Sequence, residues 1–116
     1  MKYLLLLYDD TAAEAAMTAE ERRAMVEEHI RFGRSLDERN AKLVGEALGE
    51  ASGARTIRFS DGGEPIVTDG PFLETKESLG GFYVLECAHL DDAIELAKGV
   101  PRSPGLVAEL RPIVDV

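Results

Sequence analysis

A run of seven residues near the start of the chain, KYLLLLY at 2–8, most strongly limits what this sequence can fold into. The run is almost wholly apolar and ends at Asp9 and Asp10, so it is too short for a buried helix. Short apolar runs of this kind are typical of a central strand that is covered on both faces. We therefore expect the core to be built around the first strand.

Two later segments have the periodicity of amphipathic helices. The first covers about 19–39, and Thr18 and Glu21 at its start match the capping box, in which each side chain binds the other's backbone N–H. Asn40 can end this helix in a left-handed conformation. The second helix lies in LDDAIELAKG, 90–99. One stripe of the first helix holds Met25, His29, Phe32 and Leu36.

The other apolar segments predict strands, and their order predicts the fold. In RTIRFS, 55–60, Ile57 and Phe59 alternate with Thr56 and Arg58, as in a half-exposed strand. The order β-α-β-β(-β)-loop-β-α-β predicts an α+β fold of ferredoxin-like βαββαβ type, an antiparallel sheet with two helices on one face. A chain of 116 residues predicts a single domain, 1–116. The further strands are expected at 42–48 (with Gly45 marking a bulge or close backbone approach), 65–68, 82–87 and 106–116.

The second face of such a sheet has no helices to cover it. The strands are rich in apolar residues on both sides, more than one layer of helices can bury, and a large exposed apolar face usually marks an interface. We therefore expect a homodimer with the two sheets face to face.

Composition excludes several classes of function. The chain has 13 Lys and Arg against 22 Asp and Glu, a net charge of −9, which disfavours binding to nucleic acid or to anionic membranes. No run approaches the roughly 18 apolar residues of a membrane span, and the first apolar run is interpreted as a strand and not as a signal peptide. Cys87 is the single cysteine and predicts a packed residue in a reducing compartment, so we expect a cytoplasmic protein. With two histidines and no glycine-rich nucleotide motif, neither a metal nor a cofactor is expected.

The polar stretch TDGPFLETKESLGGF, 68–82, is longer than the two to five residues of an ordinary hairpin loop. Its Gly70 and Pro71 form a turn that could hold the Asp69 carboxylate at the mouth of a pocket, or Asp69 could only stabilise the turn. Phe72 is expected to pack down over something, because its ring is costly to leave in water. Lys76 could pair with Asp69 or with an anionic ligand.

His29 is the second candidate for chemistry. On the apolar stripe of the first helix it is either a satisfied core residue or a half-buried imidazole that faces the sheet, titrates near neutrality and is oriented by a carboxylate. A His–Asp pair of this kind would transfer protons without a metal.

The whole chain resembles one family. The opening MKYLLLLY, the Glu-His-x-x-Phe of the first helix, VGEAL, VTDGPFLETKESLGGFYVLE, LDDAIELA and ELRPIVDV are similar to the YCII-related proteins, and the Asp69–Phe72 tetrapeptide to their DGPF subfamily. The resemblance implies a dimeric α+β barrel and a His–Asp pair in a cleft. His29 matches the family's histidine, and Asp69 is the best match for the acid. It also implies a genetic link to extracytoplasmic-function sigma factors.

Three roles therefore stay open for this chain. It could be a small-molecule enzyme that uses His29 and Asp69 under a lid formed by residues 70–81. It could be a non-catalytic dimer that binds a small ligand or a sigma factor. It could also be a scaffold in which His29 belongs to the core. The sequence names neither a substrate nor a reaction.

Overall fold

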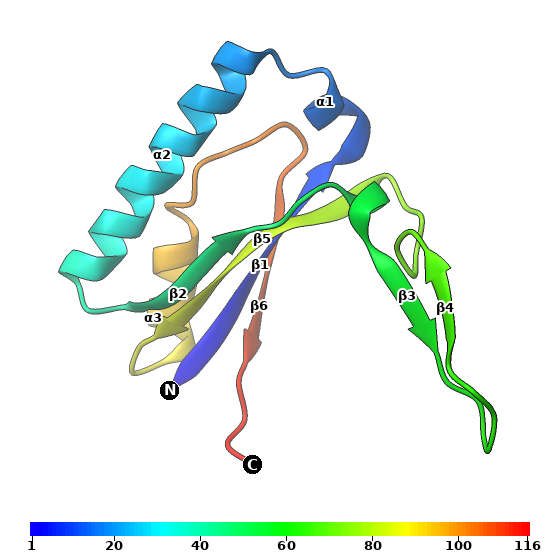
Figure 1. Cartoon of the computed structure of the whole chain (residues 1–116). Coiled ribbons are helices and arrows are strands. Elements are labelled where there is room, and N and C mark those ends of the chain that lie inside the picture. The colour runs from blue at the N-terminus through cyan, green and yellow to red at the C-terminus, as the bar shows by residue number, and fades with distance from the viewer.

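The computed structural model describes all residues, 1–116, as two sheets with three α-helices. Figure 1 shows the path of the chain. The elements are β1 (Lys2–Asp10), α1 (Thr11–Ala15), α2 (Ala19–Glu38), β2 (Lys42–Ala47), the 3₁₀ turn η1 (Ala51–Gly53), β3 (Arg55–Arg58), β4 (Ile66–Asp69), β5 (Glu77–Glu86), α3 (Leu90–Ala97) and β6 (Val107–Pro112).

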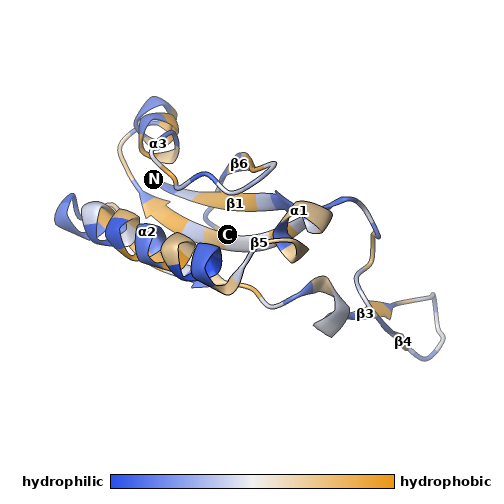
Figure 2. Cartoon of the chain, turned by 90° about the horizontal axis from the view of Figure 1, so that it is seen from above, coloured by the Kyte–Doolittle hydropathy of each residue, from blue (hydrophilic) through white to orange (hydrophobic).

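The main sheet has four strands in the order β2-β5-β1-β6, and every neighbouring pair is antiparallel. The first strand is an inner strand, as expected, with Leu5 opposite both Tyr83 of β5 and Leu110 of β6. Helices α2 and α3 lie on the same side of this sheet (Figure 2). The predicted ferredoxin-like α+β plan is therefore confirmed. No helix is long and apolar enough to span a membrane.

The core lies between the helices and one face of the sheet. Alternation along β1 turns Tyr3, Leu5 and Leu7 toward the helices, where none is more than 6% exposed. Tyr83 and Leu85 of β5 lie on the same face because they pair with residues of that set. The rest of the core comes mainly from the helices and their ends: Phe32, Leu36, Ala41, Ala93 and Val100.

The opposite face of the main sheet is open, and we call it the open face. Its centre is formed by Leu4 and Leu6 of β1, which lie opposite Val84 and Phe82 of β5 and are half-buried. The expectation that the first strand is covered on both sides therefore holds within the chain for one side only. The apolar residues of the open face are Leu4, Leu6, Tyr8, Val44, Leu79, Phe82, Val84 and Val107.

Strands β3 and β4 do not join the main sheet but form a separate two-stranded hairpin, residues 55–69, which we call the arm. The arm projects on the side of the main sheet away from the helices (Figures 1 and 2). It gives the chain a radius of gyration of 16.2 Å, against about 13 Å for a compact domain of this length. The expectation that the apolar side of β3 is the buried one is wrong: Thr56 is only 9% exposed, whereas Ile57 and Phe59 are 52% and 78% exposed.

Local signals set most element ends correctly. The capping box of α2 is present, with the Glu21 backbone N–H donating to Thr18 Oγ1 over 3.1 Å, and Asn40 is left-handed at φ 54°. The short helix α1 was not expected, and it begins where Asp10 Oδ1 accepts the Ala13 backbone N–H. Strand β5 starts five residues before the predicted strand, so the connection from β4 is only residues 70–76.

Candidate functional site

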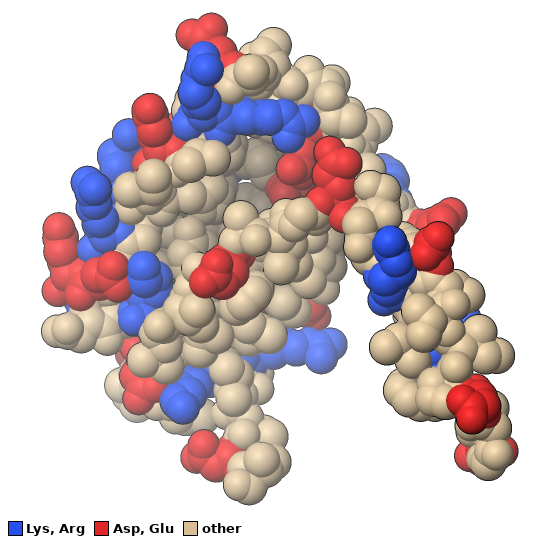
Figure 3. All heavy atoms as spheres, in the orientation of Figure 1, with Lys and Arg blue, Asp and Glu red and all other residues tan.

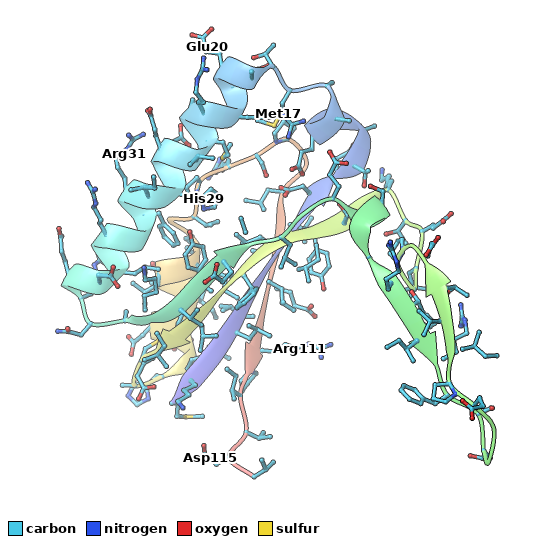
Figure 4. The ribbon with its side chains drawn as sticks, in the orientation of Figure 1. Met17, Glu20, His29, Arg31, Arg111 and Asp115 are labelled. Carbon is cyan, nitrogen blue, oxygen red and sulfur yellow. The ribbon has the colours of Figure 1, made fainter.

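His29 lies on the sheet-facing side of α2, at about the middle of the helix (Figure 4). Its Nδ1 lies 2.9 Å from the hydroxyl oxygen of Tyr83 on β5, and the two rings stack with centroids 6.1 Å apart. His29 is half-buried and its Nε2 makes no hydrogen bond within the chain. The surface is hollowed between α2 and the strands in this region (Figure 3). The helix thus presents a fixed imidazole with one free nitrogen.

The carboxylate that acts most strongly on His29 within the chain is that of Asp9. The alternation that buries Leu5 and Leu7 carries Asp9 to the same face at the end of β1, toward α2. Asp9 accepts a hydrogen bond from Ser103 Oγ, and its charge favours the protonated form of His29. Gly80 faces this carboxylate so closely that a Cβ at position 80 would collide with Asp9 Oδ2.

Burial is the main influence on the protonation of this site. It lowers the pKa of His29 below its usual value, and the negative charges of Asp9 and Glu28 oppose that fall without cancelling it. Burial also raises the pKa of Glu14 in α1, and the charge of Asp9 and a hydrogen bond to Asp9 raise it further. His29 is therefore neutral at pH 7, beside a carboxylate that stabilises the imidazolium formed when a proton arrives.

Two glycines give the site its shape. Gly45 of β2 was expected to mark a bulge or a close approach, and it marks the close approach: a Cβ at Gly45 would lie 2.5 Å from the Tyr83 ring, whereas the pairing with β5 shifts earlier, between Lys42 and Val44. Phe32 meets the same ring edge-on at 5.3 Å. Gly80 is the extra residue where the β1–β5 register shifts. Gly45 thus leaves room for Tyr83, which holds His29, and Gly80 leaves room for the Asp9 carboxylate.

The structure does not bring Asp69 to His29 within the chain. Asp69 is the last residue of β4 and its side chain is 91% exposed. Its Oδ1 is 3.1 Å from Nε of Arg55, directly opposite on β3. Within one chain the expected pairing of His29 with Asp69 is therefore not formed: the arm leads Asp69 away from the main sheet, and the charge of Asp9, at the end of β1, acts on His29.

The tetrapeptide from Asp69 to Phe72 folds back on its own arm. The Gly70 backbone N–H donates to the Ala54 carbonyl, and the Gly70 carbonyl accepts from Thr56 Oγ1, both over 2.8 Å. The Arg58 guanidinium lies 5.2 Å above the Phe72 ring, yet Phe72 remains 65% exposed. Gly70 has φ +94°, which favours glycine. The tetrapeptide therefore braces the arm, and the only packing partner found for Phe72, which was expected to pack down over something, is the Arg58 side chain.

The other residues singled out in the loop play smaller parts. Pro71 follows the positive-φ glycine and is half-buried. Lys76 forms no ion pair with Asp69, and its carbonyl accepts the Thr11 backbone N–H over 2.7 Å, which ties the end of the loop to α1. These contacts give the segment 70–76 a structural role within the chain.

Two other hollows lie away from His29. One, of about 280 Å³, is lined by Tyr8, Thr75, Glu77 and Val107 at the end of the open face. The other, of about 340 Å³, includes Arg39, Cys87 and Asp92. Burial raises the pKa of the Cys87 thiol, which therefore stays protonated at neutral pH and packs against the core as expected. No group of three or more His, Cys, Asp or Glu side chains is arranged to hold a metal ion.

The residues that sequence reasoning missed here are Asp9, Tyr83, Ser103 and Glu14. Two of them carried a usable signal. Asp9 continues the odd-numbered positions of β1 that face the helices, and Tyr83 alternates with Leu85 on the same face of β5. A histidine on the helix that covers this face would then be expected near both. Ser103 and Glu14 lie in irregular or short segments, where no periodicity places a side chain.

Comparison with known proteins agrees with this architecture. The YCII-related domain matches residues 1–116. The chain belongs to the YCII-related family. It is also similar to an uncharacterised protein of Rhizobium meliloti (strain 1021), with 38% identity over 98 residues, which cover 84% of this chain and 78% of the relative. The family thus extends over both the arm and the His29 site.

Proposed function

We propose that this YCII-related chain, which we place in the DGPF subgroup on its Asp69–Phe72 tetrapeptide, is a homodimeric small-molecule enzyme with a proton-transfer site in each subunit. The observation that carries the proposal is the environment of His29: a half-buried imidazole with Nδ1 on the Tyr83 hydroxyl, a free Nε2 and the Asp9 carboxylate nearby. In this arrangement Nε2 takes a proton from the bound molecule, Asp9 stabilises the resulting imidazolium, and Tyr83 fixes the ring.

The charges around the site limit the ligand. The charges of Asp9 and Glu28 act on the imidazole, Glu14 interacts with Asp9, and the Asp9 carboxylate is held by Ser103. An anionic group placed at Nε2 would be repelled by this acidic wall, whereas a neutral polar molecule would not. The site therefore suits isomerisation, elimination or hydrolysis of a neutral polar substrate that has one acidic proton.

The dimer is supported by the open face. At its centre the side chains of Leu4, Leu6, Phe82 and Val84 form a continuous apolar surface, a kind of surface that soluble proteins seldom leave uncovered. A second copy presents the same surface, so a two-fold axis through the open face lets each sheet cover the other.

Titration of His29 by NMR tests the site, with exposed His89 as the second imidazole in the same spectrum. Removing the charge in Asp9→Asn should lower the pKa of His29 further, because the carboxylate favours the imidazolium. Asp69→Asn should leave it unchanged. The opposite result, a response to Asp69→Asn alone, would mean that Asp69 of a second copy supplies the acid and would overturn the assignment to Asp9.

A turnover screen separates an enzyme from a regulator. Mixtures of neutral lactones, esters and enolisable ketones are incubated with the wild type and with His29→Gln, and substrate loss is followed by mass spectrometry. Consumption by the wild type that His29→Gln abolishes supports the proposal. Equal consumption by both proteins would refute a role for His29 in catalysis, and intact partner binding by His29→Gln would indicate a regulatory module.

A further inference from the structure

The arm is an isolated structure with an unusual surface. Two-stranded hairpins are marginally stable in water on their own, because they have no hydrophobic face to bury. This hairpin nevertheless exposes four large apolar side chains, Ile57, Phe59, Ile66 and Val67, and the segment after it exposes Phe72 and Leu73, each at least 52% accessible. A surface of this kind requires a partner.

The two faces of the arm differ. Cross-strand pairing puts Thr56 opposite Thr68 on one face, and this is the face that the Gly70 segment braces. Ile57 opposite Val67 lies on the other face, beside the Arg55–Asp69 ion pair. Nothing within the chain covers Ile57 and Val67, which are 52% and 61% exposed. This second face is the one available for docking.

The exposed area fits a dimer contact. Aromatic side chains each bury roughly 150–250 Å². At 78% exposure, Phe59, two residues after Ile57, alone offers roughly 120–200 Å². That is about a sixth to a quarter of the roughly 800 Å² that each subunit of a stable complex buries, and Ile57 and Val67 on the docking face add to it. The area therefore fits part of a larger interface.

We propose that the arm of each subunit docks on a second copy of this chain, so that two arms clasp the dimer formed through the open faces. The arm lies on the open-face side of the main sheet, opposite the helices, and open space separates it from the body of its own chain (Figures 1 and 3). A partner sheet on the open face would therefore lie between the main sheet and the arm. In a two-fold dimer both arms make the same contact. This inference rests on the dimer of the proposed function and adds the part played by the arm.

Sedimentation across a concentration series tests it with three single-charge variants. Val67→Glu puts a carboxylate on the docking face of the arm, and Leu6→Glu puts one at the centre of the open face. Val26→Glu is the matched control, because Val26 lies on α2 and is 58% exposed against 61% for Val67. We expect the dimer dissociation constant to rise at least tenfold in Val67→Glu and in Leu6→Glu, and to change less than twofold in Val26→Glu.

The outcomes separate the arm from the dimer. If Leu6→Glu dissociates while Val67→Glu stays as dimeric as Val26→Glu, the arm proposal is overturned and the dimer stands. A wild type that is monomeric at every concentration overturns both. Hydrogen exchange of the wild type tests docking without a substitution that could unfold the hairpin. The β3 and β4 amides should exchange at least tenfold more slowly in the dimer than after dilution to monomer. Equal exchange rates in the two states would contradict docking of the arm.

Discussion

Gly45→Ala is the substitution whose effect can be worked out most directly from this structure. The added Cβ would lie 2.5 Å from Cδ1 and 2.6 Å from Cε1 of Tyr83, where ordinary contacts begin near 3.4 Å. The ring or the strand must therefore move by roughly 1 Å in a close-packed core. The ring has little freedom to do so, since Phe32 lies edge-on at 5.3 Å and His29 holds its hydroxyl.

Overpacking of this kind costs roughly 1–3 kcal/mol of unfolding free energy. For a domain of this size that corresponds to a fall in Tm of roughly 4–12 °C. The assay is thermal unfolding followed by circular dichroism at one fixed protein concentration, so that the proposed dimerisation affects every variant at the same concentration. Gly49→Ala is the control, since no atom lies within 4 Å of a Cβ at that position. It should be neutral or stabilise by up to about 1 kcal/mol.

A double-mutant cycle tests the cause. In a Tyr83→Leu background the ring is absent, so Gly45→Ala should cost much less than in the wild type. Tyr83→Phe keeps the ring and should keep the full cost. If Gly45→Ala and Gly49→Ala melt at the same temperature, or if Tyr83→Leu leaves the cost of Gly45→Ala unchanged, the close approach of β2 to Tyr83 is not what shapes this site.

Two further outcomes concern stability. Because burial lowers the pKa of His29 below its ordinary 6.5, His29 takes up a proton at higher pH in the unfolded state than in the folded state. The free energy of unfolding should therefore fall as the pH drops below about 6.5 and level off below the pKa of the folded state. Urea unfolding from pH 7.5 to 5.5 should show this fall in the wild type and a smaller fall in His29→Gln. Leu5→Ala should lower the unfolding free energy by roughly 2–5 kcal/mol, because Leu5 is fully buried and its strand lies between β5 and β6. Val26→Ala, on the exposed face of α2, should change the unfolding free energy by less than about 0.5 kcal/mol. Equal losses in the two variants would contradict the assigned core.

The sequence predicted the main sheet and both long helices because their signals are local. The capping residues Thr18 and Glu21 and the left-handed Asn40 set the ends of α2 without reference to the rest of the chain. The apolar run of β1 identified an inner strand for the same reason. A short connection such as α1 was missed, since five residues carry too little periodicity to distinguish a helix from a loop.

What the sequence could not predict was the location of each apolar face. Alternation in β3 showed two faces but not that Thr56 is the buried side and Ile57 the exposed one. Which face is buried depends on whether the residues that pack against the strand belong to the same chain or to another. The alternation of apolar and polar residues along the strand is identical in both cases. For the same reason, the sequence could predict that Phe72 packs over something but not what that partner is.

The surroundings of His29 within the chain could not be predicted from the sequence for a different reason. A short, specific tetrapeptide drew attention to Asp69, yet specificity of a motif does not say whether it acts through chemistry or through shape. In the structure the motif makes backbone bonds through Gly70 and a cation–π contact through Phe72, both directed at the arm. The acid that faces His29 is instead Asp9, a residue that belongs to no motif.

Strand β5 joins these two parts of the molecule. The braced tetrapeptide ends the arm, and after the short segment 70–76 the chain enters β5, whose Gly80 leaves room for the Asp9 carboxylate and whose Tyr83 holds His29. The register shift at Gly80 separates the outer half of this strand, nearer the arm, from the half that carries Tyr83. Gly80 thus lets the Asp9 carboxylate keep its place, because a Cβ at position 80 would meet Asp9 Oδ2 and force that side chain to move. A long, specific motif therefore runs from the brace through Gly80 to Phe82 because one segment meets two structural demands in succession, and within the chain neither demand involves the Asp69 carboxylate in the His29 site.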